Sequence, residues 1–400
     1  MKSVCHLIPT CRWDQLGSGS VSRMLRGTGI RASGVQRFMK LLASMVLTVL
    51  ALSLWSAGGT LVALTQAASL VSSSPQLVQG HGANQARGDS SSQALISIQA
   101  LTSVGNDLVY AGSFGHGLFR SEDRGVTWTR SGQGVTDPFI LSLTVGEDGV
   151  IYVGTFRGGA FRSRDRGKSW QAINTGLKHL EIKSLLAAGD ALYAGTADGV
   201  YRLSAATDRW SMVSSGLSNI LVHAVALSPD GTLFAGTSGK GILRFKAQAA
   251  GWVRQQHGLK DHEGMIENFI RVLTIDPEGN IYAGTFDGGV FRSNDGGGTW
   301  RSISRALPND SIRGILFNSR GLFVATGHGI FKTTDKGKQW APLNKGLTGM
   351  SIQVLIESGA GVLYAGTSEG AFRSDDDGQT WHSINQGLEG GEAPAPFGMR

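Results

Sequence analysis

Short apolar runs alternate with clusters of glycine, aspartate and serine from about residue 94 to residue 390. One stretch reads RVLTIDPEGN (271–280), IYAGT (281–285) and GVFRS (289–293), and a tryptophan-led segment follows after another turn. Runs rich in Val, Ile, Tyr and Phe that are bounded by Gly, Pro, Asn and Asp are typical of β-strands joined by tight turns. The pattern predicts four short strands in each unit of about 41 residues, which leaves no room for a helix.

The unit recurs seven times with a nearly constant period. Its tryptophans are separated by 42, 40, 42, 48, 40 and 41 residues, and its LYAGT-like elements by 42, 41, 41, 48, 41 and 41. Four-stranded units that bury one another's faces build a β-propeller, whereas the alternative, a β-solenoid, usually has a shorter repeat. We therefore predict an all-β fold, a seven-bladed β-propeller of four-stranded antiparallel blades, over residues 94–390, with a C-terminal tail at 391–400. The tryptophans are Trp128, Trp170, Trp210, Trp252, Trp300, Trp340 and Trp381.

The turn before most of these tryptophans carries the motif Ser/Thr-x-Asp-x-Gly-x-x-Trp. A short Asp side chain accepts hydrogen bonds from turn amides, glycine permits a positive φ, and tryptophan packs a large apolar face on the blade. Two units lack the Asp, because Ala205 and Ala247 stand in its place when the units are aligned on tryptophan. The motif reads SEDRGVTW (121–128), SRDRGKSW (163–170), SNDGGGTW (293–300), TTDKGKQW (333–340) and SDDDGQTW (374–381).

These turns resemble the Asp-box, or BNR, repeats, whose family includes sialidases, sortilin-like receptors, xyloglucan hydrolases and photosystem II stability/assembly-factor propellers. The resemblance covers about three quarters of the chain. It implies the propeller fold but says little about activity, because one fold hosts many functions. In that family the Asp-box is a structural turn, so the resemblance implies scaffold roles for Asp123, Asp165, Asp295, Asp335 and Asp376.

A basic residue stands near the end of the third strand in every unit. Alternation along a strand points it away from the aromatic residues that face the blade stack. Because a repeated residue serves a repeated structural need, we predict that it pairs with an Asp or caps a carbonyl of the adjoining blade. The residues are Arg120, Arg162, Arg202, Arg244, Arg292, Lys332 and Arg373.

The chain begins with a basic segment and then an apolar one. Residues 1–40 form a basic leader, and residues 41–64 are uncharged and about long enough to cross a bilayer as a helix. This hydrophobic helix is either a cleavable secretory signal peptide, with Met39 as an alternative start, or a transmembrane signal anchor. In both cases the positive flank stays cytoplasmic. The domain after the flexible linker, 65–93, is then extracytoplasmic: periplasmic, secreted or lumenal, and anchored to the inner membrane if the helix is kept.

The formal net charge of +7 does not indicate a nucleic-acid partner. Before residue 41 there are seven basic residues and one acid, and the rest of the chain carries 30 basic and 29 acidic residues. The globular part therefore lacks the basic surface of a phosphate binder. Both cysteines, Cys5 and Cys11, lie in the leader with only His6 nearby, too few ligands for zinc. We predict no metal and no cofactor.

Strand order predicts which turns share a face. The turns between second and third strands lie with the blade-to-blade connections, and the motif turns lie on the opposite face. The first is the usual binding face of propellers, by family analogy. Its turn tips vary in type and balance in charge, which suits a peptide, a protein loop or a glycan, and the alternative is a solvated set of turn residues. The tips are His116, Arg157, Asp198, Lys240, Asp287, His328 and Glu369.

One blade-to-blade connection is longer than the others by about seven residues, and the excess falls in KDHEGMIENFI (260–270) on the same predicted face. A loop that breaks a strict period is a candidate partner contact. The alternative is a tolerated insertion, because lengthening a surface loop costs little. The candidate residues are Asp261, His262 and Glu263, and no adjacent set of ligands supports a metal site there.

Residue patterns typical of enzymes are absent from the sequence. The Phe/Tyr-Arg-Ile-Pro motif of sialidases does not occur, and a single propeller lacks the cleft between two propellers in which xyloglucan hydrolases hold a carboxylate pair. No Ser-His-Asp, Walker or Rossmann signature appears. We predict a non-enzymatic, extracytoplasmic binding or assembly-scaffold propeller that recognises a protein or peptide partner. A carbohydrate-active propeller (glycoside hydrolase or lectin-like) and the sensor module of a signalling system are the alternatives.

Overall fold

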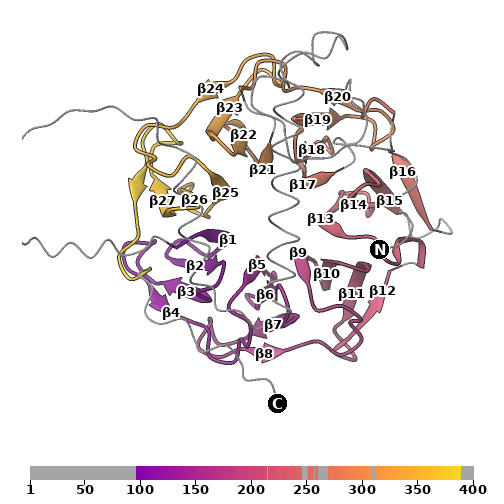
Figure 1. Ribbon diagram of the computed structural model, residues 1–400, viewed down its shortest axis with the longest axis vertical. Coiled ribbons are helices and arrows are strands. Elements are labelled where there is room, and N and C mark those ends of the chain that lie inside the picture. The colour runs from indigo at the N-terminus through magenta and orange to yellow at the C-terminus, as the bar shows by residue number, and fades with distance from the viewer. Residues whose placement is uncertain are drawn as a thin grey trace, which may run out of the picture. The chain divides into compact units, whose positions relative to one another are not determined.

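The computed structural model describes residues 96–213, 215–245, 251–255, 257–259, 269–308 and 311–388. In these ranges the chain forms seven four-stranded antiparallel sheets, each built from four consecutive strands. The sheets stand as blades around a central axis, with strands a, b, c and d of each blade running from the axis outward (Figure 1). The predicted seven-bladed β-propeller is confirmed. The predicted leader 1–40, hydrophobic helix 41–64, linker 65–93 and tail 391–400 all lie outside the described residues.

The strand bounds repeat from blade to blade. Blades 1 to 3 comprise β1 (Ile98–Val104), β2 (Leu108–Ser113), β3 (Leu118–Ser121), β4 (Thr129–Arg130); β5 (Ile140–Val145), β6 (Ile151–Thr155), β7 (Ala160–Ser163), β8 (Gln171–Ala172); and β9 (Ile182–Ala188), β10 (Ala191–Thr196), β11 (Gly199–Ser204), β12 (Arg209–Met212). Blades 4 and 5 comprise β13 (Val222–Leu227), β14 (Leu233–Thr237), β15 (Ile242–Phe245), β16 (Trp252–Gln255); and β17 (Ile270–Ile275), β18 (Ile281–Thr285), β19 (Val290–Ser293), β20 (Arg301–Ser302). Blades 6 and 7 comprise β21 (Ile312–Asn318), β22 (Gly321–Thr326), β23 (Gly329–Thr333), β24 (Ala341–Pro342); and β25 (Ile352–Glu357), β26 (Leu363–Thr367), β27 (Gly370–Ser374), β28 (His382–Ser383).

Helical structure is sparse in the described part of the chain. One 3-10 turn, η4 (Ser215–Leu217), lies between blades 3 and 4. Among the described residues, no helix has the length and apolar character that a membrane span requires.

Strand a of each blade packs closely against strand b of the preceding blade, and a small residue makes room for it. At Gly284 in β18, a Cβ atom would lie 2.4 Å from Cγ2 of Ile312, which begins strand a of the next blade. Blade 6 carries Ala325 where the other blades have this glycine, and its cross-strand partner is Gly314. A Cβ at Gly314 would lie 3.2 Å from the Cβ of Ala325. In blade 6 the glycine therefore stands in strand a instead of strand b, and the two cross-strand partners, Gly314 and Ala325, still have small side chains.

Every strand a contains a β-bulge at its second residue. In β17, Ile270 pairs with Thr285 and Val272 pairs with Gly284, so Arg271 between them has no cross-strand partner. The same register shift occurs at the start of the other six strands a. The first residue of each strand a is buried and the bulged residue is half-buried. Because a bulge redirects a side chain, seven side chains are turned out of the regular pleat on the innermost strands.

Hydrogen bonds from tryptophan join most pairs of neighbouring blades. The indole Nε1–H of Trp381 donates to the carbonyl of Leu343 in blade 6 over 2.9 Å, and four other tryptophans make the equivalent bond. Trp300 is as buried as Trp381, yet its Nε1 has no hydrogen-bond partner among the described residues, and neither has that of Trp252. Among the described residues, the two interfaces of blade 4 therefore lack the indole hydrogen bond that the other five interfaces make.

Over the described residues, blades 7 and 1 each consist of their own four consecutive strands, so blade 7 closes the ring on blade 1 without exchanging a strand. Trp128 donates from Nε1 to the carbonyl of Ile384 over 2.7 Å, and its backbone amide donates to Gln386 over 2.9 Å. The hydroxyl of Tyr364 donates to the carbonyl of Arg124 over 3.2 Å. Ring closure thus uses the same kind of contact as the other blade interfaces.

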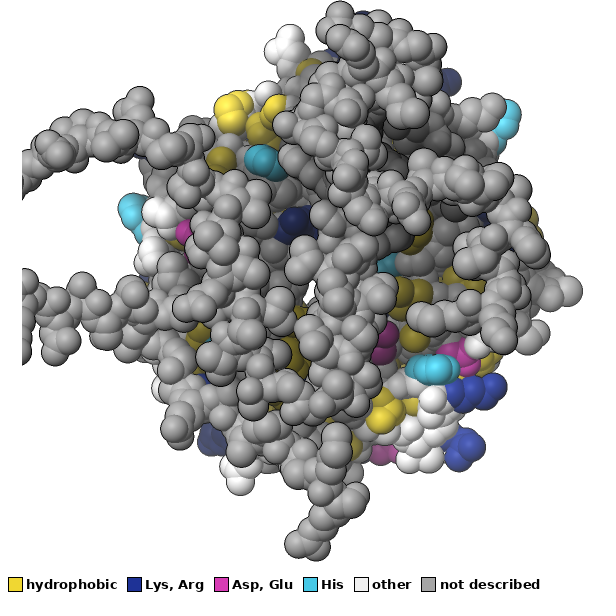
Figure 2. Space-filling model, in the orientation of Figure 1, with side chains coloured by type: hydrophobic (Ala, Val, Ile, Leu, Met, Phe, Trp, Pro, Cys, Tyr) yellow, Lys and Arg dark blue, Asp and Glu magenta, His cyan; other side chains and the backbone are white. Residues whose placement is uncertain are grey.

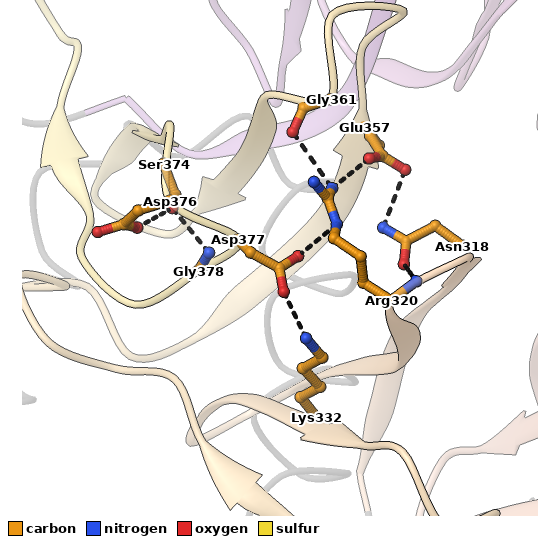
Figure 3. A network of polar contacts seen from close by, with 9 residues as sticks. All are labelled: Asn318, Arg320, Lys332, Glu357, Gly361, Ser374, Asp376, Asp377 and Gly378. Carbon is orange, nitrogen blue, oxygen red and sulfur yellow. Dashed lines mark hydrogen bonds and ion pairs between the residues drawn. The ribbon is translucent and has the colours of Figure 1, made fainter.

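Ion pairs join blades 6 and 7 on the side of the a–b and c–d turns (Figure 3). Asp377, in the c–d turn of blade 7, pairs with Lys332 and, over 2.8 Å, with Arg320 of blade 6. Arg320 also pairs with Glu357, whose carboxylate accepts a hydrogen bond from Asn318 over 3.0 Å. Because these groups form a connected and partly buried network, they contribute more than isolated surface pairs do.

The basic residue of strand c contacts the adjoining blade at four interfaces, as predicted. Lys332 pairs with Asp377, and Arg162 pairs with Asp208 in the c–d turn of blade 3. Arg244 and Arg373 cap backbone carbonyls of Gly296 and Arg124, each over 3.3 Å. In blades 1 and 5 the expectation is wrong, because Arg120 pairs with Glu122 and Arg292 bonds to Asn280 within their own blades.

The tryptophan bonds can be tested with two matched substitutions. Trp381→Phe removes the donor to Leu343 and leaves a buried carbonyl unsatisfied, whereas Trp300→Phe removes an indole N–H that has no partner among the described residues. We expect Trp381→Phe to lower the free energy of unfolding by about 1–3 kcal/mol more than Trp300→Phe. Chemical denaturation of both variants measures the difference, and equal losses would contradict the assignment.

Candidate binding face

The b–c turns and the d–a connections lie on one face, which we call the b–c face. In blade 2, the amide of Phe156 in the b–c turn donates to the carbonyl of Phe139, just before strand a, over 3.0 Å. Blades 1, 4, 5, 6 and 7 have the equivalent bond. The c–d turns meet the a–b turns instead, since the amide of Arg124 donates to the carbonyl of Asp107 over 2.9 Å.

The residues predicted at the b–c turn tips differ in exposure. Arg157, Lys240, Asp287, His328 and Glu369 are exposed, and His116 is half-buried. Asp198 is buried, where it accepts hydrogen bonds from the amide of Asn219 over 2.6 Å and from the Tyr201 hydroxyl over 3.2 Å. Its carboxylate thus takes part in the fold. Asp261, His262 and Glu263 lie outside the described residues, within which no group of three His, Cys, Asp or Glu is placed to hold a metal ion.

A ring of bulged side chains, which we call the collar, lies at the inner edge of the b–c face. Each member is the second residue of a strand a, so it stands where the d–a connection joins the innermost strand. Four consecutive blades, 3 to 6, contribute basic or histidine side chains, and the remaining members are uncharged. The collar consists of Gln99, Leu141, Lys183, His223, Arg271, Arg313 and Gln353.

The basic side of the collar carries positive charge with little compensation. Burial, and then the nearby guanidinium of Arg313, lower the pKa of Arg271 from 12.5 to about 10. Burial, and then the charges of Lys183 and Arg271, lower the pKa of His223 from 6.5 to about 4. Lys183 has a carboxylate partner, Glu181, at 2.7 Å. Within the described ranges no carboxylate pairs with Arg271 or Arg313, and Arg313 donates to the hydroxyl of Ser351 over 2.6 Å.

Exposed apolar side chains gather on the same face. Six of the eight large hydrophobic residues that the described ranges expose come from b–c turns or d–a connections: Phe114, Phe156, Leu180, Phe269, Phe286 and Met350. In Figure 2, hydrophobic, basic, acidic and histidine side chains are visible beside one another over the region that β9 to β12 occupy in Figure 1. Such gathering of apolar surface with polar neighbours marks interaction sites.

A cavity of about 1430 Å³ opens on the opposite side, lined by a–b turns of blades 2 to 6. Its walls include Glu147, Asp276, Glu278 and Arg320. Asp276 is buried and already accepts hydrogen bonds from Asn280 and the Tyr282 hydroxyl. Asp276 is thus occupied within its turn, and Arg320 is paired with Glu357 and Asp377. We therefore place the candidate site on the b–c face, where Arg271 and Arg313 have no carboxylate partner among the described residues.

The five motif aspartates each organise a c–d turn. Asp295 accepts hydrogen bonds from the amide and hydroxyl of Thr299 over 2.8 and 2.6 Å, and from the Ser293 hydroxyl over 2.7 Å. The Thr299 hydroxyl, and then its amide, lower the pKa of Asp295 from 3.8 to about 2. The pKa values of Asp123, Asp165, Asp335 and Asp376 are lowered too. These bonds support the scaffold interpretation, which stays a prediction.

The lowered pKa values predict a loss of stability in acid. A carboxyl whose pKa is lower in the folded state stabilises the fold above its unfolded value, about 3.8, and this contribution disappears as the pH falls through about 2. We expect Asp295→Asn to lower the free energy of unfolding by about 1 kcal/mol at neutral pH, because the amide makes weaker hydrogen bonds to Thr299 and Ser293 than the carboxylate does. The loss is small because solvent screens an exposed carboxylate. Denaturation of both proteins between pH 5 and about 2 should show the gap closing below about pH 4. A gap that stays constant would refute the assigned hydrogen bonds.

Comparison with known proteins identifies the class of fold. No family model matches the sequence. No curated protein sequence matches it either. Among solved structures, YCF48 bound to a D1 peptide is 15% identical with a TM-score of 0.58, and the match covers 70% of this chain and 92% of that one. The GH74 enzyme of Niastella koreensis is 13% identical with a TM-score of 0.59, over 74% and 55% of the two chains.

A third similar structure is the extracellular domain of a hybrid two component system from B. thetaiotaomicron. It is 17% identical with a TM-score of 0.58, and the match covers 69% of this chain but 39% of that one. The chain thus spans less than two thirds of the sensor domain and of the GH74 enzyme. At these identities the likeness establishes the β-propeller fold alone, and the three neighbours differ in what they do.

Proposed function

We propose that this chain is a non-enzymatic, extracytoplasmic propeller of the Asp-box group that binds a peptide or protein loop on its b–c face. The observation that carries the proposal is the pair Arg271 and Arg313, which lie in the collar without a carboxylate partner among the described residues. A half-buried guanidinium loses hydration, so an anionic ligand that restores its hydrogen bonds is favoured. The ligand is therefore expected to carry carboxylates where it meets the collar.

The comparisons support a peptide ligand. YCF48, a propeller of similar structure, has been solved with a bound D1 peptide, and the match spans nearly its whole length. The similar sensor domain is extracellular, in agreement with a leader that exports the propeller. Membrane attachment through residues 41–64 belongs to the same proposal.

The test uses the full chain and pairs of short synthetic peptides that differ only by glutamate or glutamine. We expect the glutamate members to bind more tightly. Arg271→Gln should weaken their binding by about tenfold or more, because one charge-assisted hydrogen bond contributes about 1.5–3 kcal/mol and 1.4 kcal/mol corresponds to tenfold. Calorimetry or fluorescence anisotropy measures the affinity.

The matched control is Arg164→Gln, which removes an exposed arginine from the c–d turn of blade 2, on the other side. It should leave the affinity unchanged. Equal binding of glutamate and glutamine peptides, or equal effects of the two substitutions, would overturn the proposal.

The second candidate function is carbohydrate hydrolysis or binding, which the GH74 likeness favours. The discriminating assay incubates the purified chain with xyloglucan and measures new reducing ends. We expect none. Release of reducing ends that survives repeated purification would replace the binding proposal with a glycosidase.

A further inference from the structure

Three phenylalanines form a continuous aromatic ridge on the b–c face where blades 1 and 2 meet. Phe114 and Phe156 stand in the b–c turns of these blades, and Phe139 precedes strand a of blade 2. The ring centroids of Phe114 and Phe139 lie 4.8 Å apart, and those of Phe139 and Phe156 lie 6.5 Å apart, both edge to face. Phe114 is 48% exposed and Phe156 is 38% exposed. The ridge is therefore an apolar surface in contact with water.

Two cations border the ridge. The guanidinium of Arg157 lies 5.1 Å from the ring centroid of Phe139, and the ammonium of Lys183 lies 5.7 Å from that of Phe156. The carboxylates nearby are Asp137, which is buried, and Glu181, which pairs with Lys183. The Arg157 side chain is 52% exposed, and its guanidinium comes no nearer than 3.9 Å to the Asp137 carboxylate, a long and weak ion pair.

The ridge is held in place before any ligand arrives. The buried Asp137 carboxylate accepts hydrogen bonds from the amides of Arg157 and Gly158, and from that of Phe139 over 3.2 Å. Phe114 and Phe139 also form a β-bridge. One carboxylate thus fixes the backbone beneath two of the three rings, and a surface that is already ordered loses little entropy on binding.

The ridge continues into the collar. Lys183 contacts Phe156 and is also a collar residue. The positive charges of Lys183 and Arg271 both lower the pKa of His223, which lies between them in the collar. The b–c face therefore carries a strip that runs from the three clustered rings at blades 1 and 2 to the cations at blades 5 and 6, where the guanidinium of Arg271 lies 5.9 Å from the ring centroid of Phe286. A ligand that fits both ends has an apolar group on one side and carboxylates on the other.

We infer that the ridge of Phe114, Phe139 and Phe156 is a specificity subsite, which binds an apolar, preferably aromatic, side chain of an acidic peptide. This inference rests on the proposed peptide-binding function. It specifies that, among acidic peptides, those with an apolar or aromatic side chain bind more tightly. The edge-to-face rings offer exposed aromatic surface to a further side chain, and the bordering cations attract the carboxylates beside it. A glycan is less suited, because sugar rings stack on a flat aromatic face and the exposed donors here are cationic.

The experiment compares two synthetic peptides of equal length and charge: one carries a phenylalanine among glutamates, and the other carries serine in its place. We expect the phenylalanine peptide to bind wild-type protein about tenfold more tightly, since aromatic contacts contribute up to about 1.5 kcal/mol. The double variant Phe114→Ser, Phe156→Ser should bring its affinity down to that of the serine peptide. The affinity of the serine peptide should stay unchanged.

Two controls separate this inference from the proposed function. Val126→Ser removes an equally exposed apolar side chain from a c–d turn on the other side and should change neither affinity. Arg271→Gln should weaken both peptides alike. If both peptides bind wild type equally, the ridge inference fails while the function stands; if neither binds, the proposed function fails. Thermal unfolding verifies that the variants are folded, and binding of xyloglucan oligosaccharides that the double variant abolishes would overturn the peptide assignment.

Discussion

The contact between neighbouring blades is the constraint on which the rest of this molecule depends. No blade is stable as an isolated four-stranded sheet with both faces in water, so each must bury its faces against its neighbours. In five blades the tryptophan at the start of strand d donates its indole N–H to the preceding blade, and a small residue in strand b lets strand a of the next blade approach. The exchange of glycine and alanine between Ala325 and Gly314 shows that the spacing is kept even where the sequence motif changes.

This constraint also explains where variation is allowed. The first residue of every strand a is buried against the preceding blade, while the bulge turns the second residue out of the ladder. The side chain at the second position therefore does not have to fit between two blades, and the residue type varies, for example Gln99, Leu141 and Arg271. The collar and the b–c turns, which vary in this way, make up the binding face that we propose. The c–d turns stay nearly constant, because Asp295 and its equivalents are occupied with hydrogen bonds of the turn.

The sequence predicts the blades well, because two anchors, tryptophan and the LYAGT-like element, report the same repeat independently. It also predicts that Lys332 and Arg162 pair with an Asp of the adjoining blade, because a basic residue recurs at this position in every unit, but it does not say which Asp. The collar is not predicted, because a register shift depends on how two strands pair. The sequence does contain one indication of the collar: the residue after the first apolar residue of each strand a differs from unit to unit. The burial of Asp198 depends on contacts with Tyr201 and Asn219 that no motif marks.

Closure of the ring without strand exchange has a consequence for how the chain is organised. Each blade is one uninterrupted stretch, and the junction between the last and the first blade resembles the others. The order of blades around the axis is then independent of where the polypeptide starts. A circularly permuted propeller that begins at β9, with the original ends joined by a flexible linker, should form the same seven blades with the same proposed binding face.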